Sequence, residues 1–488
     1  MHQMKKLKSL SLILLFFAAF TACEEENFFR SSEAALEFSV DTVMFDTVFT
    51  SVGSITKNFK IYNPYNRPLQ ISNIRLASGG LSNFRLNVNG LPFSGENNFE
   101  TNNVELASRD SLYIFVEVTV DPNNSNNPIL EKDSVVFETN GNIQDVKLMA
   151  WGQDFHLIDG KLIGTETWDP DKPYLVYGTA VVDSGETLTI NPGVKVYFHN
   201  KAAIVVKGTV KVQGTIDEPV LFQPDRLENL YSEVPDQWLG IFLRSESKGN
   251  EFRNAILKNG NVGIQVGDLE NKGKSEVQLE NVRIENMGYA GIMSIASTIM
   301  GENVIVGNCG KYSIALVAGG NYQFTHTTIA NYWGGLTALT PRRTPALFIS
   351  NVIYGDSIIR DLEKATFENS IIYGNSFNEI EFGIHEGAAF NYFFDHCLVR
   401  VNNSFEVENP DHYRQVLKNI NPQFVDPYDD YIYELDSLSP VRDTVALRSI
   451  SKKVPFDLKG ESRLEDAGPD LGALEWIPSE VKDESEEE

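Results

Sequence analysis

The chain has 488 residues, with 67 acidic against 41 basic side chains and a formal net charge of −26 at pH 7. A field of that sign repels polyanions, so the composition argues against nucleic acid as a partner. Three cysteines are too few for a disulfide framework, and the absence of HxH, HExxH and CxxC spacings predicts no dedicated transition-metal site.

Residues 1–22 have the pattern of a bacterial export signal. A basic start is followed by the apolar run LSLILLFFAAF, which is too short for a comfortable membrane span. The next residues, FTAC, resemble the lipobox of bacterial lipoproteins, although Phe20 stands where leucine is commoner. The resemblance implies cleavage before Cys23, lipidation of its thiol and anchorage in outer-membrane lipid. The alternative is an ordinary secretory signal followed by an incidental cysteine.

The acidic run after the cysteine bears on localisation. Glu24, Glu25 and Glu26 resemble the export signal that sends lipoproteins of the Bacteroidetes type to the outer face of the outer membrane. We therefore expect a surface-exposed lipoprotein in which residues 23–34 form a tether. The alternative is that the three acids are only a solvated spacer.

Residues 35–153 are predicted to form an immunoglobulin-like β-sandwich. Short alternating runs such as KNFKIYN, LQISNIRL and SLYIFVEVTV recur about every ten residues, with turn sequences such as NPYNRP between them. Their order resembles the immunoglobulin-like domains of the ASPM and Hydin group. That resemblance implies a binding or spacer module.

Residues 154–401 contain an internal repeat. Blocks such as FRNAILKN, LENVRIEN and GENVIVGN recur at intervals of 18 to 27 residues, which suits one coil of a parallel β-helix. Polar residues at the third position of each block would stack into a structural ladder along the axis. These ladder residues are Asn254, Asn281, Asn303, His326, Asn351, Asn369 and His396.

The opening of this region carries the most specific resemblance in the chain. The string VVDSGETLTINPGVKVYFHNKAAIVVKGTVKVQGTIDEPVLF closely resembles the start of pectin-lyase-like β-helix proteins. The expected fold class is therefore all-β, with an N-terminal β-sandwich followed by a right-handed parallel β-helix. In such a helix we expect Cys309 and Cys397 to be buried free thiols.

The end of the chain is predicted to close the β-helix. Residues 402–477 include DLGALEW, which resembles the C-terminal segment of many secreted bacterial β-helix proteins. An open β-helix end exposes unpaired strand edges, so we expect this segment to act as a cap. Residues 478–488 form an acidic tail predicted to be disordered, to which we assign no function.

One loop stands out as a candidate glycan-binding site. NYWGGLTALTPRRTPA combines a tryptophan, suited to stacking on a sugar face, with two arginines that can bind carboxylates. Two further cations follow about one coil later. The candidate residues are Trp333, Arg342, Arg343, Arg360 and Lys364. The alternative is that Trp333 packs on the helix surface and the arginines pair with acids.

A second polar cluster could bind calcium through carboxylate oxygens or act in acid-base chemistry. It consists of Glu379, Glu381, His385, Glu386 and Asp395. The alternative is a set of solvated turns, and otherwise we predict no cofactor and no metal.

The sequence contains no complete catalytic signature, because the NTD, GHG and RxK motifs of polygalacturonase-like hydrolases are absent. We therefore expect an envelope-anchored protein that binds a polysaccharide or another envelope protein. The alternative is a polysaccharide lyase or glycoside hydrolase acting on an extracellular polysaccharide.

Overall fold

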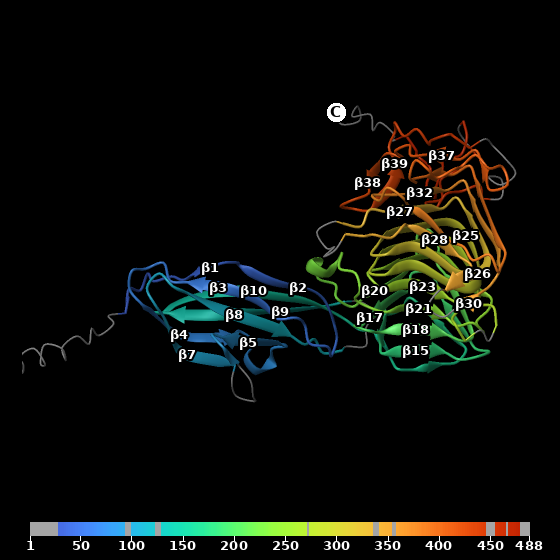
Figure 1. Cartoon of the computed structure of the whole chain (residues 1–488). Coiled ribbons are helices and arrows are strands. Elements are labelled where there is room, and N and C mark those ends of the chain that lie inside the picture. The colour runs from blue at the N-terminus through green and yellow to red at the C-terminus, as the bar shows by residue number, and fades with distance from the viewer. Residues whose placement is uncertain are drawn as a thin grey trace, which may run out of the picture. The chain divides into compact units, whose positions relative to one another are not determined.

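The computed structural model describes residues 28–92, 99–122, 128–270, 273–334, 341–353, 358–445, 454–464 and 467–478. The chain divides into two compact units between Asp154 and Phe155 (Figure 1). The described residues contain two short 3-10 helices, η1 (Gly79–Leu81) and η2 (Asn229–Tyr231), and no helix long and apolar enough to cross a bilayer.

The N-terminal unit is a β-sandwich of two five-stranded sheets. Apolar side chains alternate along the strands and meet in one core that includes Phe59, Ile71 and Phe137. In sheet order, the first sheet contains β1 (Glu37–Phe38), β3 (Lys57–Tyr62), β8 (Ser111–Val118), β5 (Phe84–Val88) and β6 (Leu91–Pro92). The second contains β2 (Thr42–Phe49), β10 (Asn142–Gln153), β9 (Ile129–Thr139), β4 (Leu69–Leu76) and β7 (Glu100–Leu106).

The second unit is a parallel β-helix whose strands lie in three stacks (Figure 1). Stack 1 contains β11 (His156–Asp159), β14 (Tyr174–Tyr177), β17 (Lys195–Phe198), β20 (Val220–Pro224), β27 (Thr328–Asn331), β32 (Ile371–Gly374), β35 (Leu398–Val399) and β37 (Leu417–Lys418). Stack 2 contains β12 (Leu162–Ile163), β15 (Thr179–Val182), β18 (Ala203–Val206), β21 (Gly240–Leu243), β23 (Val262–Val266), β28 (Leu347–Ser350) and β33 (Ile380–Gly383). Stack 3 contains β13 (Glu166–Trp168), β16 (Thr187–Ile190), β19 (Thr209–Gln213), β31 (Leu362–Glu368), β34 (Phe390–Asp395) and β36 (Tyr413–Arg414).

Four long strands turn a corner and belong to more than one stack: β22 (Asn250–Lys258), β24 (Glu276–Met287), β25 (Ala290–Cys309) and β26 (Tyr312–Thr325). Two short antiparallel pairs lie outside the stacks: β29 (Val352–Ile353) with β30 (Ile358–Ile359), and β38 (Phe424–Asp426) with β39 (Ile432–Leu435). The predicted fold class, an all-β chain with a sandwich followed by a right-handed parallel β-helix, is therefore confirmed.

The interior of the β-helix is apolar and stacked from coil to coil. Phe324, Phe367 and Phe394 form one such row, with ring centroids 5.3 and 5.0 Å apart. Cys309 and Cys397 are both buried free thiols, as expected. Burial raises the pKa of each thiol to about 12, so neither is a reactive thiolate near neutral pH.

The corner between stacks 3 and 1 carries the polar ladder. Its residues have φ between 45° and 54°, a left-handed conformation that asparagine tolerates better than most residues. Asn281 Nδ2 donates to Asn254 Oδ1 at 3.1 Å, and Asn303 Nδ2 donates to Asn281 Oδ1 at 2.9 Å. Further along, Asn369 Nδ2 donates to His326 Nε2 at 3.0 Å. Five of the predicted positions, from Asn254 to Asn369, are therefore linked in two hydrogen-bonded runs.

Asn351 requires a correction, because it lies at the end of β28 in stack 2 and not at the ladder corner. Its Nδ2 donates to the carbonyl of His385 at 2.9 Å. The coil that begins at His326 reaches the ladder again only at Asn369, 43 residues later. The block ISNVIYGD resembles the repeat blocks in sequence, but it lies within that long coil, so its asparagine does not reach the ladder corner.

A second ladder lies at the end of stack 1, and the sequence analysis missed it. Asn286 Nδ2 donates to Asn259 Oδ1 at 2.6 Å, and Asn308 Nδ2 donates to Asn286 Oδ1 at 3.0 Å. Asn331 continues the row by donating to the carbonyl of Cys309 at 3.0 Å. The signal was present as the asparagine that ends four of the repeat blocks.

The predicted C-terminal cap also needs correction. Parallel pairing continues beyond Val401 to β37, and the residues between Val401 and β37, including Phe405, Val407 and Tyr413, pack in or on the main core. The apolar side chains that the structure describes between Phe424 and Leu474 pack along the outer face of stack 1 (Figure 1). There a second apolar cluster joins Ile305 and Ile371 of the coils to Tyr433 of β39. This segment, residues 419–476, is called the strap below.

Candidate functional site: an aromatic strip at the edge of stack 2

The predicted glycan-binding loop is largely committed to internal contacts. The ring of Trp333 is only 9 % exposed, and it covers Gly310, where an added Cβ would lie 3.3 Å from Trp333 Cζ2. The side chain of Arg342 is 1 % exposed and forms a double ion pair with Glu379 at 2.6 and 2.8 Å. These contacts favour the alternative in which the tryptophan packs on the helix and Arg342 pairs with an acid.

The remaining loop residues do not join a common site. Arg343 is exposed beside Arg342. Lys364 lies at the start of stack 3, in β31, where its Nζ donates to Gln323 Oε1 at 2.9 Å, and Arg360 lies at the corner that leads into that stack. The structure therefore distributes the five predicted residues over two corners of the coil, and a role for Arg343, Arg360 and Lys364 in glycan binding stays a prediction.

The second predicted cluster is dispersed as well. Glu379 is buried with Arg342, where burial raises the pKa of its carboxyl and the hydrogen bonds from Arg342 oppose that shift. Asp395 contacts His396 and Arg414, and His385 Nδ1 accepts the backbone N–H of Gly387 at 3.0 Å. Within the described ranges, no group of three His, Cys, Asp or Glu side chains is arranged to hold a metal ion.

A different set of residues forms a partly exposed aromatic strip along the start of stack 2. Tyr289 precedes the first residue of β25, Tyr312 begins β26 one coil later, and Phe348 lies in β28 on the following coil. The ring centroids of Tyr289 and Tyr312 are 6.3 Å apart, and those of Tyr312 and Phe348 are 5.6 Å apart. The strip therefore results from the stacking of three successive coils, with the rings offset along the strands, because Tyr312 pairs with Ala290 and Phe348 pairs with Ala315.

Charged groups flank the strip at both ends. Lys311 Nζ lies 4.9 Å from the ring centroid of Tyr289, within cation-π range. Glu381 is exposed on β33, in register with Phe348. Partial burial raises the pKa of the Tyr312 phenol, with smaller contributions from Tyr289 and Glu381, so Tyr312 remains a hydroxyl donor at neutral pH.

The same corner, closer to the N-terminal end of the β-helix, carries a histidine-aspartate pair. His199 Nδ1 and Asp225 Oδ2 are 2.7 Å apart, and the imidazole stacks on Tyr177 with ring centroids 4.3 Å apart. Burial raises the pKa of Asp225, while the hydrogen bond to His199 acts in the opposite direction. The sequence analysis did not single out His199, because its partner lies 26 residues away with no motif between them.

The strip can hold sugar rings by stacking, because aromatic faces pack well against the C–H faces of sugars. Lys311 and Glu381 can donate and accept hydrogen bonds with hydroxyl groups at its edges. The three aromatic residues of the strip lie on three different coils, so they form no motif within a short stretch of sequence. The sequence signal is an aromatic residue at or near the start of three successive strands of stack 2, β25, β26 and β28.

Residues 160–299 match the family model described as "Pectate-lyase like beta helix domain". The chain therefore carries a pectate-lyase-like β-helix domain, as its opening string suggested. The matched part includes Tyr289 but ends before Tyr312 and Phe348. No curated protein sequence shows significant similarity to the chain.

Three solved structures are similar to parts of the chain, each at low identity and with a low TM-score. A family 123 glycoside hydrolase from Clostridium perfringens is 8 % identical over 24 % of this chain and 25 % of its own, with a TM-score of 0.17. The ASH/PapD-like domain 7 of human CEP192 is 8 % identical over 28 % of this chain and 96 % of its own, with a TM-score of 0.18. The catalytic domain of a GH87 α-1,3-glucanase is 11 % identical over 74 % and 79 %, with a TM-score of 0.21. Similarities at this level carry no argument about fold or function.

Proposed function

We propose that this protein is a lipoprotein of the outer membrane, anchored through Cys23 and exposed at the cell surface, whose β-helix binds a polysaccharide. The observation that carries the binding proposal is the aromatic strip of Tyr289, Tyr312 and Phe348 on three successive coils. The pectate-lyase-like domain supports a carbohydrate ligand. The sandwich then serves as a spacer between the lipid and the binding face.

A binding screen tests the strip. Purified full chain in detergent is titrated with soluble neutral and acidic polysaccharides, and affinity electrophoresis measures retardation. Tyr312→Ala together with Phe348→Ala removes two of the three rings, so we expect at least a tenfold loss of affinity. Phe377→Ala is the matched control, because Phe377 is 86 % exposed and lies outside the strip. Binding that survives the double substitution would refute the strip as the site.

The second candidate function is cleavage of a polysaccharide, and the His199–Asp225 pair is the observation that favours it. Asp225 can hold Nδ1–H of the imidazole, which leaves Nε2 as a base. Release of reducing ends, or ultraviolet absorbance from an unsaturated product, would report cleavage. If cleavage is found, His199→Gln should lower its rate at least a hundredfold with little change in binding. Polysaccharide binding without products would leave the binding proposal as it stands.

A further inference from the structure

A groove of about 400 Å³ lies between the strap and the ladder corner of the coils, away from the aromatic strip. The volume is in the range of small-ligand sites and leaves room for one or two sugar rings. Its walls include Ile216, Glu280, Glu302, Val454, Phe456 and Gly460. Neither the sequence analysis nor the proposed function uses this groove.

One wall is a pair of acidic side chains on adjacent coils. Glu280 of β24 and Glu302 of β25 are in-register partners in a parallel ladder, so their backbones lie about 4.8 Å apart. Both side chains are exposed. The ladder residues Asn281 and Asn303 follow them along the chain and complete this wall. A carboxylate offers several acceptor sites, so each acid can accept hydroxyl donors from a ligand in addition to its contacts within the chain.

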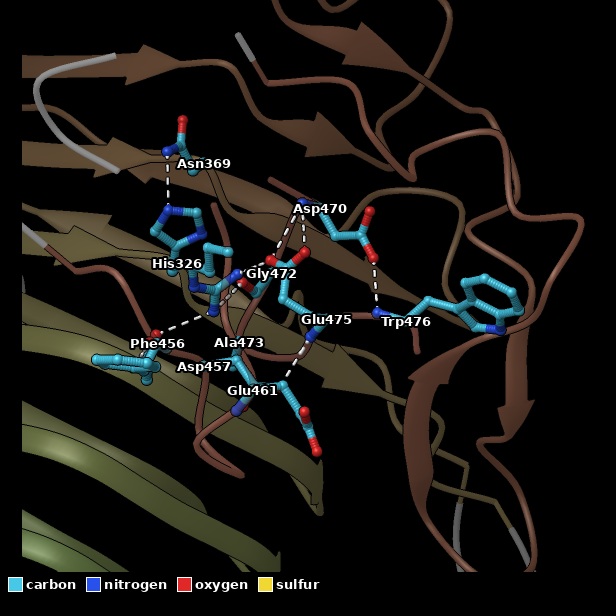
Figure 2. Close-up of polar contacts among 12 residues, drawn as sticks. His326, Asn369, Phe456, Asp457, Glu461, Asp470, Gly472, Ala473, Glu475 and Trp476 are labelled. Atoms are coloured by element: carbon cyan, nitrogen blue, oxygen red, sulfur yellow. Dashed lines mark hydrogen bonds and ion pairs between the residues drawn. The ribbon is translucent and has the colours of Figure 1, made fainter. Parts of the chain in front are cut away.

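The opposite wall presents an aromatic ring on a rigid turn. Phe456 is 56 % exposed, and its carbonyl accepts Asn303 Nδ2 at 2.9 Å. The next residue, Asp457, accepts the backbone N–H groups of Lys459 and Glu461 through one oxygen, both at 2.8 Å. Its other oxygen accepts the N–H of Glu475 at 2.9 Å. Figure 2 shows Phe456 beside this network of the strap. The backbone that carries the ring is held in this way, so it loses little conformational freedom when a ligand stacks on the ring.

We propose that this groove is a second carbohydrate subsite, selective for an uncharged sugar unit. Phe456 and Ile216 provide apolar surface for the C–H face of the ring, and Glu280 and Glu302 accept its hydroxyl groups. The two carboxylates outnumber the one nearby cation, Arg253, so the net negative charge of this wall repels a uronate or a sulfated sugar. The proposal does not depend on the strip, because its residues come from another corner of the coil and from the strap.

A basic side chain of a protein partner is the competing occupant. The acidic row already has an internal cation nearby, because Arg253 Nε lies 3.4 Å from Glu280 on the preceding coil. A further cation would therefore gain less attraction than the two acids alone suggest. Arg253 weakens the binding of a neutral ligand less than that of a cation, since a neutral ligand binds through hydrogen bonds and stacking.

The test uses the full chain carrying Tyr312→Ala and Phe348→Ala, so that the strip does not contribute. Calorimetric titration is performed with neutral hexasaccharides of glucose, mannose and galactose, and with hexagalacturonate. We expect at least one neutral hexasaccharide to bind and hexagalacturonate not to bind. Adding Phe456→Ala should lower the affinity at least fivefold, whereas adding Leu438→Ala should not. Leu438 is the matched control because it is 80 % exposed in the same strap.

Three results would overturn the subsite. In the first, no neutral hexasaccharide binds the strip-deficient chain. In the second, binding persists unchanged with Phe456→Ala. In the third, hexalysine binds in competition with the sugar probes or in their place, which would make the groove a site for basic side chains. Failure of the strip proposal is distinguishable, because it is judged from Tyr312→Ala and Phe348→Ala in the otherwise unchanged chain.

Discussion

At the residue scale, a ladder asparagine combines a left-handed backbone conformation with a hydrogen-bonded side chain. Asn281 has φ of 54°, and its amide both donates to Asn254 and accepts from Asn303. Asparagine and glycine tolerate that conformation, and only asparagine also supplies the two hydrogen bonds. His326 takes a ladder position through Nε2, and burial lowers its pKa well below 6.5, which keeps the imidazole neutral and able to accept.

Two substitutions of Asn281 separate the contribution of the backbone conformation from that of the side-chain hydrogen bonds. Asn281→Ala should lower the free energy of unfolding by roughly 2–4 kcal/mol, because two partly buried hydrogen bonds and a tolerated left-handed conformation are lost together. Asn281→Gly keeps the conformation and should cost about 1 kcal/mol less. Urea unfolding followed by fluorescence measures both variants. Equal loss for alanine and glycine would show that backbone strain contributes nothing at this position.

Asp470 predicts a pH dependence of stability. Burial raises its pKa from 3.8 to about 6, although the backbone N–H groups of Trp476 and Asp443 favour the charged form. The folded state therefore binds a proton more tightly than the unfolded state. The stability from this proton is fully present below pH 3.8 and is lost as the pH rises through about 6.

Asp470→Asn isolates that contribution. From well below pH 3.8 to well above pH 6, the stability of the original chain relative to the variant should fall as the pH rises, in total by about 3 kcal/mol, because one pKa unit corresponds to about 1.4 kcal/mol. Unfolding midpoints in urea at a series of pH values measure the difference. A difference that does not change with pH would show that Asp470 titrates alike in the folded and unfolded states.

At the element scale, a buried ion pair within the strap positions the arginine that binds the strap to the coils. Arg463 and Glu475 are paired with side-chain exposures of 0 and 1 %, and Arg463 Nη2 donates to the ladder residue Asn303 at 3.0 Å. Glu475 also accepts the backbone N–H of Asp470 at 3.1 Å (Figure 2). The DLGALE motif therefore supplies Glu475, which holds Arg463 in position to bind the asparagine ladder.

Arg463→Met should loosen the strap, because it leaves a buried carboxylate without its cation. The expected cost is about 3–5 kcal/mol. Limited proteolysis should then cut the strap at least tenfold faster while the remaining coils resist. The control is Lys459→Met, since the pair of Lys459 with Glu434 is exposed and should contribute below about 1 kcal/mol. Equal cleavage of both variants would mean that the buried pair does not hold the strap.

At the scale of the whole molecule, the proposal combines a lipid anchor at Cys23 with a binding face on the β-helix. Cys23 and the acids after it lie outside the described residues. Cys23→Ser should prevent acylation, because serine lacks the thiol that carries the first lipid. The chain should then leave the membrane fraction and lack the mass of the acyl chains, which fractionation and intact-mass spectrometry measure.

Surface exposure is tested separately. Replacing Glu24, Glu25 and Glu26 by alanine should leave the chain in the membrane fraction but protect it from protease added to whole cells. Membrane retention of the Cys23→Ser chain would contradict the lipid anchor. Unchanged protease accessibility of the alanine variant would contradict the acidic export signal alone.

Much of the architecture could be predicted because it depends on patterns within short stretches of sequence. The repeat blocks predicted the coils and most of the ladder, since each coil must place a similar residue at the same corner to stack on its neighbours. Asn351 was misplaced because the block around it satisfies the local pattern within a coil of 43 residues. The second ladder was not predicted, although an asparagine at the end of four successive blocks indicates it.

The candidate sites were harder to predict than the fold. Trp333 and Arg342 are close in sequence, and that proximity suggested a ligand site, yet the structure buries both. The aromatic strip and the groove each combine residues from different coils or from a coil and the strap. Side chains that meet only through coil register leave no motif in a short stretch of sequence.

The sequence by itself determined the all-β class, the sandwich, the coil repeat and the left-handed corners, because period, turn residues and asparagine conformational tolerance act over a few neighbouring residues. Only the tertiary structure decided that Arg342 is an internal ion-pair partner, that the strap lies along stack 1, and which aromatic rings remain at the surface. Burial and pairing depend on residues far apart in the chain, which are brought together only when the coils stack and the strap folds back on them.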